Sequence, residues 1–150
     1  MKKFVLIGLV LASSLTSFSQ STKQVKWTFN AKKISEKVYE VTWTADINGN
    51  WHMYSQNAGD GPQPTVFTFT KNPLINLDGK VKEVGKMQTV YEEVFKSDVR
   101  FYESTVSFVQ LVKVKGTAKT NLAGKVEFMV CNDKTCLPPA AVEFAINIGG

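Results

Sequence analysis

The sequence predicts a single all-β domain, an antiparallel β-sandwich. The first observation is alternation: within Val38–Ala45, apolar and polar residues alternate from Tyr39 onward, and β-branched and aromatic residues dominate. The second is that similar short runs recur along the chain, separated by glycine- and asparagine-rich turns. The third is that no convincing amphipathic helix interrupts them. Many short strands without helices favour two packed antiparallel sheets.

Residues 1–19 have the layout of a secretory signal peptide. Lys2 and Lys3 precede an apolar run from Phe4 to Ala12, and Ser17–Ser19 form a small-residue cleavage site before Gln20. About nine apolar residues are too few to span a membrane, which takes about 20. The absence of a cysteine after this run argues against a lipid anchor. We therefore expect export, cleavage, and a periplasmic or secreted domain at residues 20–150.

The composition of the rest of the chain excludes some classes of function. The formal net charge is +5, but the basic residues are scattered and form no stripe, so nucleic-acid binding is not expected. No later apolar run is long enough to cross a membrane, so the mature protein should not span one. No internal repeat or linker divides residues 20–150, and about 131 residues suffice for one domain with a core.

The alternating runs predict seven to nine strands. Those that can be placed are Val25–Phe29, Val38–Ala45, Thr65–Thr70, Val99–Val114, Lys125–Cys131 and Ala141–Ile148. The predicted turns are Asn48–Asn50, Gly59–Pro62, Asp78–Gly79, Lys115–Gly116 and Ala123–Gly124. Residues from Glu83 to Phe95 keep no clear period, so a helical turn and a long loop both remain open.

The two cysteines of the chain, Cys131 and Cys136, flank the four residues Asn-Asp-Lys-Thr. Residues that flank such a turn can face each other across a hairpin, with Cα atoms about 4.5–5.5 Å apart, a separation that a disulfide tolerates. Pro138 and Pro139 follow closely; they lack N–H groups and fix φ, so this segment should remain a stiff edge. At an edge, another protein can reach a sulfur atom.

The residues alone leave two interpretations of the pair, a local clip or a reactive site. As a clip, a disulfide across so short a loop contributes only about 2–2.5 kcal/mol in the entropy model, which a sandwich of this size does not need. A zinc site would need four ligands, more than two cysteines and the single His52 provide. A cysteine hydrolase is disfavoured because each thiol has a nearer partner in the other cysteine than in His52.

The stretch Cys131–Pro139 resembles the C-x4-C-x-P-P hairpin of the N-terminal periplasmic domain of DsbD-type thiol:disulfide interchange proteins. Gly49–Ser55 is similar to the Gly-x-Trp-x-x-Tyr-Ser segment of that family. Glu92–Phe95, followed by Val99–Tyr102, resembles its acidic and aromatic cap loop and the next strand. The resemblance covers most of Val25–Ile148 and implies an immunoglobulin-like β-sandwich that passes electrons between proteins.

The resemblance also implies roles for the cysteines. Cys136 would receive the incoming thiolate and Cys131 would resolve the mixed disulfide. Lys134 could favour a thiolate and Asp133 could oppose it. A thioredoxin-like domain or a membrane electron transporter would be the donor and periplasmic disulfide proteins the acceptors. Neither a metal nor an organic cofactor is needed. Family members usually continue into membrane and thioredoxin-like domains, which these 150 residues lack, so we expect separate partners.

An aromatic lid would protect a reactive dithiol from stray oxidants. The resemblance points to Phe95 over Cys136, although an ordinary core position for Phe95 is the alternative. His52 and Tyr54 are expected to line the same site, with sandwich core as the alternative for Tyr54 and simple hydrogen bonding for His52. Glu92 and Glu93 could tune the thiols or could simply be solvated.

A different class of function is a secreted binding or adaptor sandwich with an inert hairpin disulfide. The fold hosts many such proteins and cannot decide between the two. The reduction potential can, because structural disulfides generally lie below about −300 mV and working pairs lie higher.

Overall fold

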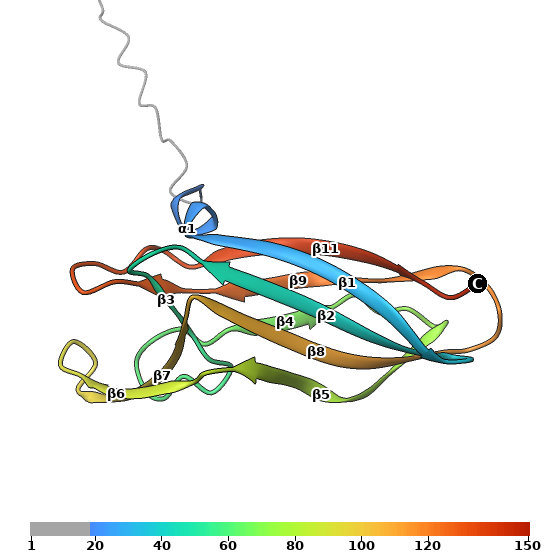
Figure 1. Ribbon diagram of the computed structural model, residues 1–150, viewed down its shortest axis with the longest axis horizontal. Helices are drawn as coiled ribbons and strands as arrows, with labels where there is room; N and C mark the ends of the chain where they lie inside the picture. The colour runs from blue at the N-terminus through green and yellow to red at the C-terminus, as the bar shows by residue number, and fades with distance from the viewer. Residues whose placement is uncertain (1–18) are drawn as a thin grey trace, which may run out of the picture.

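The computed structural model describes residues 19–150, so residues 1–18 of the predicted signal peptide lie outside the described residues. The described chain has eleven strands and one short helix (Figure 1). The strands form three antiparallel sheets. The all-β prediction is therefore confirmed, and the described residues form more strands than the seven to nine that the alternation indicated.

The first sheet has the order β1-β2-β8-β5, formed by Val25–Ser35, Val38–Ile47, Thr105–Val114 and Ile75–Gly85. The second sheet has the order β11-β9-β4, formed by Ala140–Ile148, Thr120–Phe128 and Val66–Phe69. The third, which we call the site sheet, has the order β10-β3-β7-β6, formed by Val130–Cys131, His52–Tyr54, Ser97–Glu103 and Gln88–Glu92. The helix α1 (Ser19–Gln24) precedes β1.

Aromatic side chains join the first and second sheets across the core. Trp43 of β2 is fully buried, and its ring centroid lies 5.1 Å from those of both Phe67 (β4) and Phe144 (β11). Trp27 of β1 reaches Phe128 of β9 at 5.5 Å. The alternation that predicted β2 thus places every second residue of that strand in the core, from Tyr39 to Ile47.

Two predicted turns are wrong, because their glycines serve strands instead. Asp78–Gly79 lies within β5, where the pairing with β8 shifts register, and the buried amide of Gln110 donates to both carbonyls. Ala123–Gly124 lies within β9. A Cβ atom on Gly124 would lie 2.2 Å from the carbonyl oxygen of Thr68, so glycine is required there for close approach of β4.

Other predicted elements are divided differently in the structure. Glu83–Phe95 is neither a helical turn nor a long loop: it contains the end of β5, all of β6 and a turn. The single run Val99–Val114 divides at Ser104, which has φ 63°, so that β7 and β8 enter different sheets. The run Lys125–Cys131 divides in the same way at Met129. Hydrophobic alternation does not show where a chain changes sheets.

The site sheet extends from one end of the sandwich, and the β6–β7 turn and the loop after β10 both lie at that end (Figure 1). Glu83 of β5 connects this sheet to the first one. Its carboxylate accepts hydrogen bonds from the Ser55 hydroxyl at 2.8 Å, the Gln56 backbone N–H at 2.6 Å and the Tyr102 hydroxyl at 3.0 Å. These bonds fix the position of β3 and β7, which carry the residues around the cysteines.

Candidate functional site

Cys131 and Cys136 form a disulfide at the end of β10. Their Cα atoms are 4.0 Å apart, and the two residues form an isolated antiparallel bridge. Asn132 shapes the turn between them: its side-chain oxygen accepts hydrogen bonds from the backbone N–H groups of Lys134 and Thr135, both at 2.9 Å. This is the local bonding that favours asparagine in turns. The bond therefore forms across the four-residue spacing as expected, but the Cα atoms lie closer together than the about 4.5–5.5 Å expected for residues that face each other across a hairpin.

The two sulfur-bearing residues differ in exposure. Cys131 is 1% exposed and packs with Tyr54, Val99 and Phe101, whereas Cys136 is exposed. A thiolate in solution or on another protein can therefore reach Cys136, while the packed side chains around Cys131 exclude it. Thiol–disulfide exchange depends on which sulfur is accessible. The structure thus distinguishes two cysteines that spacing alone leaves equivalent.

The segment after Cys136 belongs to no strand up to Pro139, but it is held in place. The Leu137 N–H donates to the Val130 carbonyl at 3.0 Å, and the Ser21 hydroxyl of α1 donates to the carbonyl of Pro138. The helix that the sequence did not predict thus supports the proline segment. Because this segment is anchored at Leu137 and at Pro138, Cys136 is presented on a defined edge.

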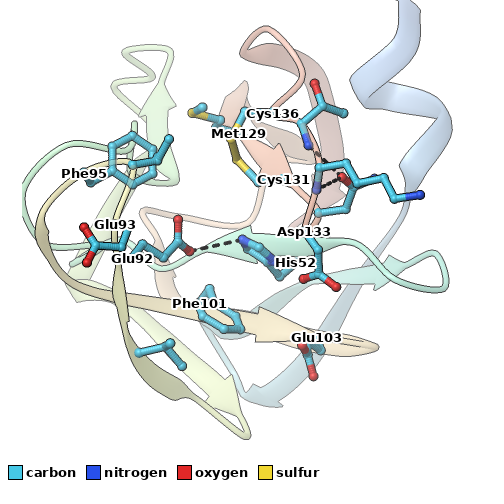
Figure 2. Close-up of a pocket in the computed structure, with 15 residues that line it drawn as sticks. His52, Glu92, Glu93, Phe95, Phe101, Glu103, Met129, Cys131, Asp133 and Cys136 are labelled. Carbon is cyan, nitrogen blue, oxygen red and sulfur yellow. Dashed lines mark hydrogen bonds and ion pairs between the residues drawn. A yellow bond between two sulfur atoms is a disulfide. The ribbon is translucent and has the colours of Figure 1, made fainter.

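His52, Tyr54 and Glu92 form a connected polar group next to the buried cysteine. Figure 2 shows the contact between His52 and Glu92. His52 lies opposite Cys131 in the β3–β10 pairing. The Tyr54 hydroxyl lies 3.2 Å from both carboxylate oxygens of Glu92, and His52 Nε2 lies 3.3 Å from that hydroxyl. Because the single hydroxyl hydrogen is directed to Glu92, Nε2 is the nitrogen that donates to Tyr54.

The surroundings of His52 and Tyr54 shift the pKa values of both side chains. Burial lowers the pKa of His52, and this outweighs the opposite effects of Glu92, Glu103 and Asp133, whose negative charges favour the protonated ring. Burial also raises the pKa of Tyr54, and both the charge of Glu92 and the hydrogen bond to it act in the same direction. Tyr54 is therefore a neutral donor to Glu92 at ordinary pH.

The turn that follows β6, residues 93–96, carries Phe95; we call this turn the cap. The Phe95 N–H donates to the Glu92 carbonyl at 3.2 Å, and its ring meets that of Tyr54 edge-on, with centroids 6.2 Å apart. Gly61 lies directly beneath the ring: a Cβ atom there would be 2.6 Å from Phe95 Cδ1. Phe95 is half-buried, so it is neither a core residue nor a free surface residue.

Phe95 and Cys136 line one pocket of about 700 Å³. Figure 2 shows Phe95 across the pocket from the disulfide, with Met129 beside the sulfur atoms. All the predicted site residues except Tyr54 line this pocket, and Tyr54 lies behind it, where it bonds Glu92. The structure thus brings the predicted residues together around the disulfide.

The family model for the N-terminal region of the thiol:disulfide interchange protein DsbD matches residues 19–147. The chain belongs to this family. A comparison with the curated proteins found no match. Family membership and the disulfide together support a thiol:disulfide interchange module, whose partners in general are thiol and disulfide proteins.

Two solved structures show the same fold at low identity. The N-terminal domain of DsbD from Neisseria meningitidis, in the reduced form, has a TM-score of 0.56 and 17% identity over 86% of this chain and 89% of that one. The N-terminal periplasmic domain of ScsB from Proteus mirabilis has a TM-score of 0.61 and 15% identity over 90% of this chain. This chain spans about half of that ScsB structure, 49% of it. The expected immunoglobulin-like sandwich of the DsbD N-terminal domain is confirmed.

Several residues of this DsbD-type site were not predicted from the sequence, among them Phe101, Glu103 and Met129. Phe101 packs against the His52 ring with centroids 4.4 Å apart, Glu103 lies opposite His52 in the β3–β7 pairing, and Met129 precedes β10. The alternation within β7 indicates that Phe101 and Glu103 share a face. That this face belongs to the site depends on the pairing of β7 with β3, which no local pattern shows.

Two further features of the DsbD-type domain concern metals and membranes. Within residues 19–150, no group of three or more His, Cys, Asp or Glu side chains is arranged to hold a metal ion. No helix in that part of the chain is long and apolar enough to cross a membrane.

Proposed function

We propose that this domain is an exported component of a protein-disulfide reductase system. It relays reducing equivalents through Cys131 and Cys136, from a thioredoxin-like domain or membrane electron transporter to periplasmic proteins that carry disulfides. The observation that carries the proposal is the pairing of an exposed Cys136 with a buried Cys131 within a domain of this family.

The domain is reduced in two exchange steps. A donor thiolate attacks Cys136 Sγ, the Cys131–Cys136 bond breaks, and the Cys131 sulfur leaves as a thiolate that takes a proton. The second thiol of the donor, as thiolate, then attacks the donor sulfur of the mixed disulfide and releases Cys136. Two electrons and two protons have moved to this domain, and the donor now carries the disulfide.

When the reduced domain delivers its electrons, it becomes the attacking partner and the acceptor protein carries the disulfide. The Cys136 thiolate attacks the disulfide of an acceptor protein and releases one acceptor thiol. Cys131, one turn away across the bridge, then attacks Cys136 Sγ and releases the second acceptor thiol. Burial favours this second role for Cys131, because a sulfur that external proteins cannot reach can still reach Cys136.

The residues around the pair have supporting roles in this proposal. Phe95 lies across the pocket from the exposed Cys136 in this structure, and in this proposal its ring closes over the sulfur to limit access of oxidants and opens again when a partner docks. Tyr54 and His52 hold Glu92, and with it the start of the cap. Glu93 and Lys134 lie on the pocket wall, where their charges act on an approaching partner.

The periplasm is the proposed location. The layout of residues 1–19 supports export, and the ScsB domain with the same fold is described as periplasmic. Disulfides also form and persist in that compartment.

A trapping experiment with purified proteins tests the function. A Cys131→Ala variant, which retains Cys136, is incubated with a thioredoxin that lacks its own resolving cysteine and is activated as a mixed disulfide with a small thiol. We expect a covalent complex through Cys136, seen on non-reducing gels and located by mass spectrometry. The Cys131→Ala/Cys136→Ser double variant is the matched control. Failure of native Cys131→Ala to react, when the same protein reacts after denaturation, would refute the proposal.

A further inference from the structure

We propose that the groove around the disulfide is built to dock a partner whose reactive cysteine is surrounded by positive charge. The inference rests on the proposed function and specifies its partner: a thioredoxin-like protein with an apolar contact surface and a rim of lysine or arginine. The site thereby selects among the many thiol proteins that share its compartment.

The floor of the groove is apolar and accessible. Val94 is 77% exposed and Val90 is 45% exposed, and both line the pocket together with Phe95, Phe101 and Met129. Exposed apolar side chains gathered beside a reactive sulfur are typical of a surface that another protein covers. They supply contact area to a partner but do not distinguish one partner from another.

The rim of the groove is strongly acidic. Its titratable residues are four carboxylates, Glu92, Glu93, Glu103 and Asp133, against one lysine, Lys134, besides the neutral His52. The chain as a whole carries a formal net charge of +5. The charge around the disulfide is therefore opposite in sign to that of the molecule that carries it.

These carboxylates are largely free to act on a partner. Among the described residues, none of the four pairs with a lysine or arginine, and Glu92 lies 3.5 Å from His52 Nε2, a contact that becomes an ion pair only when the ring is protonated. Glu103 accepts a hydrogen bond from the neutral Gln88 amide at 2.7 Å. The charges of Glu92, Glu103 and Asp133 all act to raise the pKa of His52, which shows that their fields converge beside Cys131.

The acidic rim affects thiol–disulfide exchange because of the charge of the attacking group. The attacking group is a thiolate, an anion, and it must enter a groove lined by negative charge to reach Cys136. Like charge opposes that approach unless the partner brings cations that face the carboxylates. A partner with a basic rim is steered in, and one with an acidic rim is repelled.

Small thiols of different charge test the rim directly. The oxidised domain is reduced with cysteamine (cationic), 2-mercaptoethanol (neutral) and 3-mercaptopropionate (anionic), and each rate constant is corrected to the thiolate concentration. We expect the ratio of cationic to anionic rate constants to fall by roughly fivefold when a Glu93→Gln/Asp133→Asn variant replaces the wild type at low salt. Comparing one ratio between two proteins cancels the intrinsic reactivities of the thiols.

Controls separate this effect from a general change of charge. A Glu36→Gln/Glu143→Gln variant loses the same charge away from the pocket and should keep the wild-type ratio. Raising the salt to about 1 M, where screening acts within about 3 Å, should lower the wild-type ratio toward that of the rim variant. A Glu93→Lys variant should increase the rate with the anionic thiol.

A protein probe then tests the kind of partner. Two forms of one thioredoxin are compared, which differ only in lysine or glutamate substitutions around its active-site motif. The lysine form should reduce the domain at least severalfold faster at low salt, and this preference should shrink with the rim variant. Equal rates for both forms, or small-thiol ratios unchanged by neutralising the rim, would overturn the inference while exchange itself persists. Failure of every thiol to reduce the native disulfide would instead overturn the proposed function, and this inference with it.

Discussion

The hydroxyl of Tyr54 is shared between the two carboxylate oxygens of Glu92, each 3.2 Å away. Tyr54 is a fully buried residue of β3, the strand that pairs with the cysteine-bearing β10, and Glu92 is the last residue of β6, directly before the cap. One side chain thus ties the start of the cap to the strand that faces Cys131. The closure of the site should depend on this contact.

Tyr54→Phe removes that hydroxyl and leaves the ring. We expect a loss of about 1–2 kcal/mol in the free energy of unfolding, because Glu92 and His52 both lose a hydrogen-bonding partner on a buried side chain. We also expect faster alkylation of Cys136 in the reduced protein, because the cap is less firmly held. Denaturant titration and the rate of iodoacetamide modification measure the two effects.

Tyr102→Phe is the matched control. It removes a hydroxyl that bonds Glu83 at 3.0 Å, away from the cap, so it should lower stability without accelerating alkylation. Equal acceleration in both variants would show that alkylation follows general loosening rather than release of the cap.

Phe95→Ala tests the lid. Because the ring is half-buried, the free energy of unfolding should fall by less than the roughly 3–5 kcal/mol typical of a core phenylalanine, for which Phe128→Ala is the control. Alkylation of the reduced protein should become faster, since the rate follows access to the thiolate. A folded Phe95→Ala protein with an unchanged iodoacetamide rate would rule out the lid.

The difference in exposure between the cysteines predicts different reactivities. In Cys131→Ser the remaining thiol, Cys136, is at the surface and should be alkylated rapidly. In Cys136→Ser the remaining thiol, Cys131, is 1% exposed and should react at least about tenfold more slowly. Mass spectrometry of timed samples gives both rates. Similar rates in two folded variants would contradict the proposed division of roles.

The lowered pKa of His52 predicts a pH dependence of stability. The ring takes up a proton more readily in the unfolded chain, so a fall in pH through about 6.5 and toward the lower folded-state value favours unfolding. The stabilising effect of neutral His52 is thus present above that window and lost below it. Between pH 7.5 and 5.5, His52→Gln should lose less unfolding free energy than the wild type; parallel curves would refute this assignment.

Local patterns in the sequence predicted what local forces decide. Alternation located β2, because each step along a strand reverses the side chain. The Cys-x4-Cys spacing anticipated a bond that a short turn allows. The helix α1 was missed because six residues carry too little periodicity to recognise.

The arrangement of the site could not be read in the same way. Tyr54 and Glu92 are separated by 38 positions, and their contact depends on β3, β7 and β6 being neighbours in one sheet. Glu103 joins the site through its register with His52. Pairing between distant strands is set by the packing of the whole domain, so these residues came either from family resemblance or from the structure alone.

The reduction potential of the Cys131–Cys136 bond tests the central claim most directly. The protein is equilibrated in a series of dithiothreitol redox buffers, thiols are trapped by alkylation, and the reduced fraction is counted by mass spectrometry. A redox relay predicts a potential above about −300 mV, so that a thioredoxin-like donor can reduce the bond. A potential well below that value would mean an inert structural disulfide and would contradict the account.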